Sequence, residues 1–385
     1  MKVLSLLCAL LVSDCARYNA QNSMMALLLS PGAAATASVA SAAASNNPVN
    51  QIQSGLINMT SATTNVAVNS VDTTKAMAFC YFRTTASEPA CVPTCELASP
   101  TQITVQTGGN STNYFAQWYL IEFASGALVQ RGSFTFTGGV NTTNITLGSS
   151  VDATKSFVLL TARMPSTDHT LDAERLVRAT ITGPTTLTLT RNANSAINIT
   201  AHWQVVQLQD ASVQSGTTTI GAGASSSNVA ISSVDLAKSF LFFNTAAPTG
   251  IGGFEERYTV RGRYSSSTGL TFTRASTTSS VDVSYFAVQM NDASSTQSGT
   301  LATSSFPSPN TATVMNATLT SVTPATAVAV ISSSVQNTGG TQQSDLDSGS
   351  FVPQITSATN LQVERGSNQN QLATVDYFVV QFVSQ

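Results

Sequence analysis

The chain carries one segment of about 80 residues four times in succession. Each copy opens on a Gln-x-Gly tripeptide, continues with an alternating strand that begins at Asn, and closes on a strand that begins with an aromatic residue. The opening glycines are Gly55, Gly132, Gly216 and Gly299, and the closing aromatic residues are Trp118, Trp203, Tyr285 and Tyr377. Because these independent anchors recur in one order, we predict that the chain folds as four copies of one structural unit.

Three of the copies also share the sequence Ser-Val-Asp-x-x-Lys, at 70–75, 150–155 and 233–238. The fourth copy has Ser-Val-Thr-Pro at 321–324 in its place. The Asp and the Lys suggest a charge pair, but a turn between two strands explains the pattern more simply. In such a turn the Asp caps its own backbone, and the Lys shields a sheet edge against stray pairing.

Apolar and polar residues alternate with period two between the anchors, as in Leu361-Gln-Val-Glu-Arg365, where Leu361 and Val363 share one face. Such alternation is typical of an antiparallel sheet that packs one face on a core. About six short strands per copy, separated by Gly, Asn and Ser, indicate a small sandwich. We therefore predict an all-β fold of four tandem antiparallel β-sandwich domains. The predicted ranges are a leader and Ala/Ser-rich arm at 1–49 and sandwiches at 50–125, 126–210, 211–292 and 293–385.

The N-terminal residues have the pattern of a targeting segment. Lys2 precedes an apolar run from Val3 to Val12, which has the length of a signal-peptide core and is too short to span a bilayer. The run leads to Cys15, as in the cleavage box of bacterial lipoproteins, although Asp14 stands where that box has a small residue. We expect an extracellular protein, at a cell surface or a virion surface, and Cys15 is a candidate lipid anchor.

Charged residues are scarce. They make up 9% of the chain, against about 25% in a typical soluble domain, and the net charge is -3. The 16 basic residues are scattered and form no cluster for phosphates, so we expect no nucleic acid partner. Low charge also weakens the repulsion between copies of a protein, which favours self-association.

The sequence has no pattern typical of catalysis or of a cofactor site. Nucleophilic catalysis needs a nucleophile, a base and an orienting group in one pocket. The two histidines, His169 and His202, both lie in the second copy and outside the recurring anchors. There is no Gly-rich phosphate loop, zinc spacing or calcium loop. We therefore expect a protein that is not an enzyme and has no catalytic residue, cofactor or metal.

Three cysteines lie in the first copy, at Cys80, Cys91 and Cys95. In an oxidising compartment, the close pair Cys91 and Cys95 is a candidate for a small loop disulfide. A zinc site would need a fourth ligand, and neither histidine lies near these cysteines in the sequence.

One segment differs between the copies in length and composition. It follows a hydrophobic strand in each copy, at 84–95, 165–173, 246–254 and 333–350. We call these segments the variable loops. Loops on a repeated scaffold are where differences in binding usually reside, and tolerated drift explains the variation equally well.

The third copy resembles the H-type lectin domain. The resemblance rests on the opening Gln214-Ser-Gly216, on Arg263 ahead of a Ser/Gly turn, and on the closing strand that starts at Tyr285. That family has a six-stranded antiparallel β-sandwich, is commonly trimeric, and binds sugars such as N-acetylgalactosamine in grooves between protomers. The resemblance implies Arg263 and Tyr285 as candidate ligand-binding residues. In the second copy, His202 and Trp203 resemble a His/Trp pairing of the family and are candidates on the same ground.

We expect a secreted structural protein that assembles into or decorates an extracellular filament, surface layer or virion fibre, as related tandem sandwiches do in phage tail fibres and bacterial surface filaments. Short linkers between the copies predict a stiff rod, and the Ala/Ser-rich arm is a candidate for packing along a sheet edge of a neighbouring copy. The alternative is a multivalent glycan-binding adhesin, in which weak sites add up. A third interpretation is an array of accessory modules that has lost the catalytic domain of a secreted enzyme.

Overall fold

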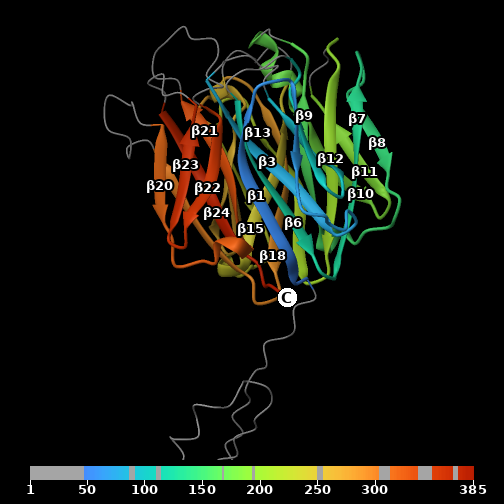
Figure 1. Cartoon of the computed structure of the whole chain (residues 1–385). Coiled ribbons are helices and arrows are strands. Elements are labelled where there is room, and N and C mark those ends of the chain that lie inside the picture. The colour runs from blue at the N-terminus through green and yellow to red at the C-terminus, as the bar shows by residue number, and fades with distance from the viewer. Residues whose placement is uncertain are drawn as a thin grey trace, which may run out of the picture. The chain divides into compact units, whose positions relative to one another are not determined.

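The structure is a computed structural model of the whole chain (Figure 1). It describes residues 47–85, 92–109, 114–166, 169–192, 196–248, 255–302, 313–336, 349–366 and 372–385. The described residues are nearly all β, with 63% in strands and 6% in helices. The predicted all-β fold of tandem antiparallel sandwiches is confirmed.

Each repeat consists of six antiparallel strands in two sheets of three. The first, sixth and third strands form the inner sheet, and the second, fifth and fourth strands form the outer sheet. Repeat 1 comprises β1 (Val49–Met59), β2 (Thr63–Ala67), β3 (Ala76–Thr84), β4 (Thr94–Ser99), β5 (Gln102–Gln106) and β6 (Tyr114–Phe123). Repeat 2 comprises β7 (Ala127–Phe136), β8 (Thr142–Thr146), β9 (Ser156–Arg163), β10 (Arg178–Gly183), β11 (Thr186–Thr190) and β12 (Ile199–Leu208).

The other two repeats have the same order of strands. Repeat 3 comprises β13 (Ala211–Ile220), β14 (Ser226–Ala230), β15 (Ser239–Ala246), β16 (Arg261–Ser266), β17 (Gly269–Thr273) and β18 (Val281–Met290). Repeat 4 comprises β19 (Ser295–Ala302), β20 (Val314–Thr318), β21 (Ala327–Gln336), β22 (Phe351–Ser357), β23 (Asn360–Arg365) and β24 (Leu372–Gln381). Short 3-10 helices join some of the strands, namely η2 (Ala153–Lys155), η3 (His169–Arg175), η4 (Leu236–Lys238), η5 (Glu255–Arg257) and η7 (Pro324–Thr326).

Alternation along the strands builds the core of each sandwich. Leu361 and Val363 on β23 are fully buried, as the sequence pattern predicts. The corresponding pairs on the other fifth strands are also fully buried, namely Ile103 and Val105, Leu187 and Leu189, and Leu270 and Phe272. The period of two therefore identifies the inward face of the outer sheet in every repeat.

The recurring glycine and the recurring aromatic residue are cross-strand partners in the inner sheet. Their register pairs are Gly55 with Trp118, Gly132 with Trp203, Gly216 with Tyr285 and Gly299 with Tyr377. A Cβ on any of the four glycines would lie only 2.5 to 3.1 Å from the aromatic side chain. The glycine is therefore required because the aromatic side chain lies directly over the backbone.

The shared Asp caps the turn before the third strand, as the sequence predicts. The side chains of Asp72, Asp152 and Asp235 each accept a hydrogen bond from the backbone N–H two residues further on. The backbone N–H of each Asp in turn donates to a side-chain oxygen near the end of the closing strand, on Glu122, Gln207 and Gln289 respectively. These bonds fasten the turn to the inner sheet.

The amines of Lys155 and Lys238 donate to the backbone carbonyl groups of Gln209 and Asp292, just after the closing strands. Their expected role in shielding a sheet edge stays a prediction. Lys75 forms an exposed pair with Asp72 at 3.3 Å.

The four repeats form a closed cycle of contacts within one compact unit. The fourth strand of each repeat packs against the third and sixth strands of the next, namely β4 on β9 and β12, β10 on β15 and β18, β16 on β21 and β24, and β22 on β3 and β6. The last of these contacts joins repeat 4 to repeat 1, where the Val49 N–H also donates to the Val383 carbonyl group at 2.7 Å.

The predicted stiff rod is therefore wrong. The third strands carry aromatic side chains that bury one another between repeats, as in the stacked rings of Phe157 and Phe242 and the edge contact of Phe79 with Phe242. Burial of this apolar surface favours the cycle over a row of separate domains. Because the repeats pack as one unit, the domain boundaries stay a prediction.

Several predictions concern residues outside the described ranges. These are the leader, the candidate lipid anchor Cys15 and the Ala/Ser-rich arm. In the part of the chain that the structure describes, no helix is both long and apolar enough to cross a membrane.

Candidate functional site

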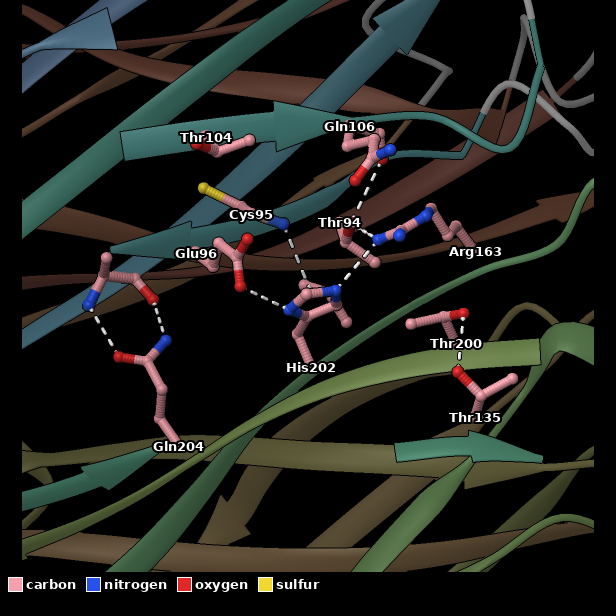
Figure 2. Close-up of polar contacts among 12 residues, drawn as sticks. Thr94, Cys95, Glu96, Thr104, Gln106, Thr135, Arg163, Thr200, His202 and Gln204 are labelled. Atoms are coloured by element: carbon pink, nitrogen blue, oxygen red, sulfur yellow. Dashed lines mark hydrogen bonds and ion pairs between the residues drawn. The ribbon is translucent and has the colours of Figure 1, made fainter. Parts of the chain in front are cut away.

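His202 lies where repeat 2 meets repeat 1 (Figure 2). We call the contact surface between two neighbouring repeats a seam. The His202 Nδ1 atom lies 2.7 Å from Glu96 Oε2 on β4 of repeat 1, and its Nε2 atom lies 2.9 Å from Arg163 Nη1 on β9. Arg163 also donates to Thr94 Oγ1 at 2.7 Å. The imidazole ring therefore joins a carboxylate of one repeat to a guanidinium of the next.

The chemistry of the partners fixes the role of each ring nitrogen. A guanidinium only donates, so Nε2 accepts and the ring hydrogen lies on Nδ1, the nitrogen that is 2.7 Å from Glu96 Oε2. The contact with His202 holds the pKa of Glu96 below its ordinary value; burial opposes this, and the charge of Arg163 adds to it. Both nitrogens of His202 are engaged and its side chain is 11% exposed. The arrangement suits a link between repeats better than a free general base.

Gln204 extends the same seam along β12. Its side chain accepts from the Ala78 N–H at 3.0 Å and donates to the Ala78 carbonyl group, so it extends the backbone bonding of β3 across the seam. Arg131 donates to the carbonyl group of Ala76 on the same strand. Burial lowers the pKa of Arg131 to about 10.

Every seam has its own ion pair. The pairs are Glu96 with His202, Arg178 with Asp282, Arg261 with Asp376, and Arg83 with Glu364. Arg178 and Arg261 both open a fourth strand, but their partners lie at different positions, and the other two pairs use other positions again. If a repeat were placed beside a different neighbour, the charged side chain at its seam would lose its partner. The differences therefore favour a single order of the repeats around the cycle.

The structure does not bring the four predicted ligand-binding residues together. His202 and Trp203 are adjacent on β12 and point to opposite faces, and Trp203 covers Gly132 inside its sandwich. Tyr285 is also inside its sandwich, with its ring centroid 5.9 Å from that of Phe272. Arg263 is exposed on the outer sheet of repeat 3. Their role in ligand binding stays a prediction.

The cysteines of repeat 1 lie partly outside the described residues. Cys91, one half of the predicted disulfide, is among those outside. Cys95 is a buried free thiol. A hydrogen bond with Cys80 raises the pKa of Cys95 well above its ordinary value, and burial adds to this effect. The disulfide between Cys91 and Cys95 stays a prediction.

A cavity of about 330 Å³ lies where the third strands of all four repeats meet. One equivalent position of these strands contributes a polar side chain from each repeat, namely Tyr81, Thr161, Asn244 and Ser332. A smaller cavity of about 160 Å³ continues past the same residues. We call the larger cavity the central cavity.

Residues within or shortly after the variable loops border the central cavity. Its wall includes Val92 and Pro93, Arg175 to Val177, Tyr258 to Val260, and Gly349 to Phe351. The variation of these loops predicts either differences in binding or tolerated drift. The cavity itself was not predicted, because the expected rod of repeats would have none. The missed signal is the third strand, which is apolar and nearly free of charge in every repeat.

Comparisons with known proteins leave the site to be interpreted from its geometry. No protein-family model matches the chain, and no curated protein matches it. Within the described ranges, no group of three or more His, Cys, Asp or Glu side chains is arranged to hold a metal ion.

Proposed function

We propose that this chain is a secreted, non-enzymatic structural protein whose copies associate through their sheet edges in a filament, layer or fibre at a cell or virion surface. The observation that carries the proposal is a set of four equivalent edge strands. The second strand of each repeat, β2, β8, β14 or β20, lies at one end of its outer sheet and pairs with a single described strand.

These edge strands lack two common protections against pairing, a charged residue and a proline. The four strands read TTNVA, TTNIT, SSNVA and VMNAT, without a charged residue or a proline. Each is only five residues long, so a single edge pairing is weak. Four of them on one body gain strength through effective concentration.

A triple variant tests the proposal by placing one charge on each of three edges. Ala67, Thr146 and Ala230 are exposed at the ends of β2, β8 and β14, so Ala67→Lys, Thr146→Lys and Ala230→Lys change the edges without entering the core. We expect ordered assemblies of the wild type in electron microscopy and monomers of the variant in light scattering. The matched control is Ser70→Lys, Ser150→Lys and Ser233→Lys, which adds the same charge at exposed turn positions. A monomeric wild type at high concentration, or equal assembly of both variants, contradicts the proposal.

The second candidate function is glycan binding by H-type-lectin-like repeats. The central cavity favours it, because binding sites for small molecules are concave, mostly apolar and equipped with a few polar groups. A glycan array probed with the full chain at high density tests this candidate, and silence on every glycan would remove it.

A further inference from the structure

Two cysteines of repeat 1 lie together in the core of its sandwich. Cys80 is on β3 of the inner sheet, and Cys95 is on β4 of the outer sheet. Cys95 belongs to the buried core cluster of repeat 1, and Cys80 packs against that cluster. A hydrogen bond joins the two thiols, and both are free cysteines in this structure. The sulfur atoms are therefore neighbours between the two sheets.

Repeat 3 shows independently that these two positions are in contact. The strand registers place Cys80 at the position that Phe243 has in repeat 3. They place Cys95 at the position of Gly262. A Cβ on Gly262 would lie 2.8 Å from the ring of Phe243. The third strand and the fourth strand therefore approach each other closely at this pair of positions.

The other repeats fill the same space with side chains of unequal size. A large apolar residue on the third strand faces a compact residue on the fourth, namely Leu160 with Ala179, Phe243 with Gly262, and Ile331 with Pro353. Repeat 1 instead has two side chains of intermediate size, Cys80 and Cys95. Both belong to the residue type that can form a covalent cross-link.

We infer that Cys80, in place of Cys91, is the disulfide partner of Cys95, and that the bond forms when the protein meets an oxidising compartment. This bond joins the inner sheet of repeat 1 to its outer sheet. It also closes a loop of the chain that contains the variable loop at 84–95. The disulfide goes beyond the proposed function and is independent of edge association, which uses no cysteine.

A small disulfide such as oxidised glutathione supplies the oxidising equivalents. The thiolate of Cys80, which is half-buried, attacks the sulfur–sulfur bond of glutathione, forms a mixed disulfide and releases one glutathione thiolate. The thiolate of the buried Cys95 then attacks the Cys80 sulfur, forms the protein disulfide and releases the second glutathione thiolate. The two protons that the cysteines lose pass to the glutathione thiolates. Two protein thiols are thus oxidised, and one glutathione disulfide is reduced to two glutathione molecules.

Disulfide mapping of the full chain tests the inference. The reduced protein is incubated in a glutathione redox buffer until its free-thiol content is constant, blocked with iodoacetamide and digested without reductant. Trypsin cleaves after Arg83, so Cys80 and Cys95 fall in different peptides that only a disulfide holds together. Tandem mass spectrometry shows which of Cys91 and Cys95 carries the alkyl group. We expect the two peptides to be linked and Cys91 to be alkylated.

Other patterns of labelling overturn the inference. A bond between Cys91 and Cys95 would leave Cys80 alkylated and would place the disulfide within the variable loop. A bond between Cys80 and Cys91 would leave Cys95 alkylated. Alkylation of all three cysteines when the oxidised protein is unfolded in the blocking step would mean that the core pair stays reduced.

Two variants provide a readout that does not depend on peptide mapping. The oxidised wild type should unfold at a higher urea concentration than the reduced wild type, because the cross-link restricts the unfolded chain. This difference should persist in Cys91→Ser, which keeps the proposed pair, and should disappear in Cys80→Ser. The opposite result, with the difference kept in Cys80→Ser and lost in Cys91→Ser, overturns the inference. If Cys80→Ser does not fold, the peptide maps of the wild type and of Cys91→Ser decide.

Discussion

The indole ring of Trp203 lies over Gly132 of the neighbouring strand, so close that a Cβ on the glycine would be 2.7 Å from ring atom Cζ2. Trp203 is 7% exposed and pairs with Gly132 in the register of β12 and β7. The glycine is thus part of the packing of the tryptophan, and the same relationship recurs in all four repeats.

Gly132→Ala is expected to destabilise the protein by about 1–3 kcal/mol, because the added methyl group forces the buried indole out of its place. Denaturant unfolding followed by tryptophan fluorescence measures the change. The control is Gly221→Ala, where nothing lies within 4 Å of the added Cβ, and there we expect a change of less than about 0.5 kcal/mol. Equal effects of the two substitutions would refute the packing role.

The glycine and its aromatic partner show which parts of the fold could be predicted from the sequence. Their fixed order in four copies predicted the repeat and the strands, because a close approach of ring and backbone restricts both positions. The sequence also predicted that Leu361 and Val363 lie on one face of their strand, because side chains of a strand alternate between its two faces.

The sequence did not predict that the four repeats close into a cycle. This closure depends on contacts between residues far apart in the sequence, such as Tyr119, whose hydroxyl donates to the Pro353 carbonyl group at 2.9 Å. These contacts use different residues at each seam, so self-comparison of the repeats conceals them. The same reason explains why Arg175 and Asn244, from different repeats and different positions, were not recognised as neighbours of one cavity.

Gln204→Ala is expected to cost about 1–3 kcal/mol of unfolding free energy, because it leaves the N–H and carbonyl group of Ala78 buried without partners. Gln204 is itself 7% exposed. The matched control is Gln130→Ala, which removes a similar pair of bonds, to the N–H and carbonyl group of Ser149, at an exposed site. There water replaces the amide, so the cost should be clearly smaller. Equal losses in chemical unfolding of the two variants would argue against a buried seam.

Arg261→Gln should be the most costly change at an ion pair. Arg261 Nη1 lies 2.9 Å from Asp376 Oδ2, and the Asp376 side chain is only 2% exposed. Removing one partner of a buried pair costs about 3–5 kcal/mol, because the other charge stays buried. Arg178→Gln is the control, since Asp282 is 28% exposed and lies 4.0 Å away, and there we expect about 0–1 kcal/mol. Adding Asp376→Asn to Arg261→Gln should recover part of the loss, and a thermodynamic cycle that shows no coupling would contradict the pairing.

Cys95 should react slowly with alkylating agents in the folded, reduced protein. The hydrogen bond with Cys80 and burial raise its pKa, so little of the reactive thiolate is present at pH 8. Peptide mass spectrometry after a timed iodoacetamide pulse measures the rate, and unfolding should make Cys95 as reactive as an ordinary cysteine. In Cys80→Ser the thiol partner is lost, and we expect the rate to change. Rapid labelling of Cys95 in the folded wild type would contradict the buried thiol pair.

The seam between Glu96 and His202 should lose strength in acid. The folded-state pKa of Glu96 lies below its ordinary value of 4.5, so the ionised carboxylate stabilises the folded state at pH values above 4.5. That contribution is lost as the pH falls through the lowered pKa, where folded and unfolded chains are both protonated. Glu96→Gln removes the charge and keeps the size, so the wild type should be more stable than this variant at pH 6 and the difference should shrink toward pH 3. Urea midpoints at several pH values measure it. A difference that stays constant across this range would mean that the charge of Glu96 does not hold repeat 1 to repeat 2.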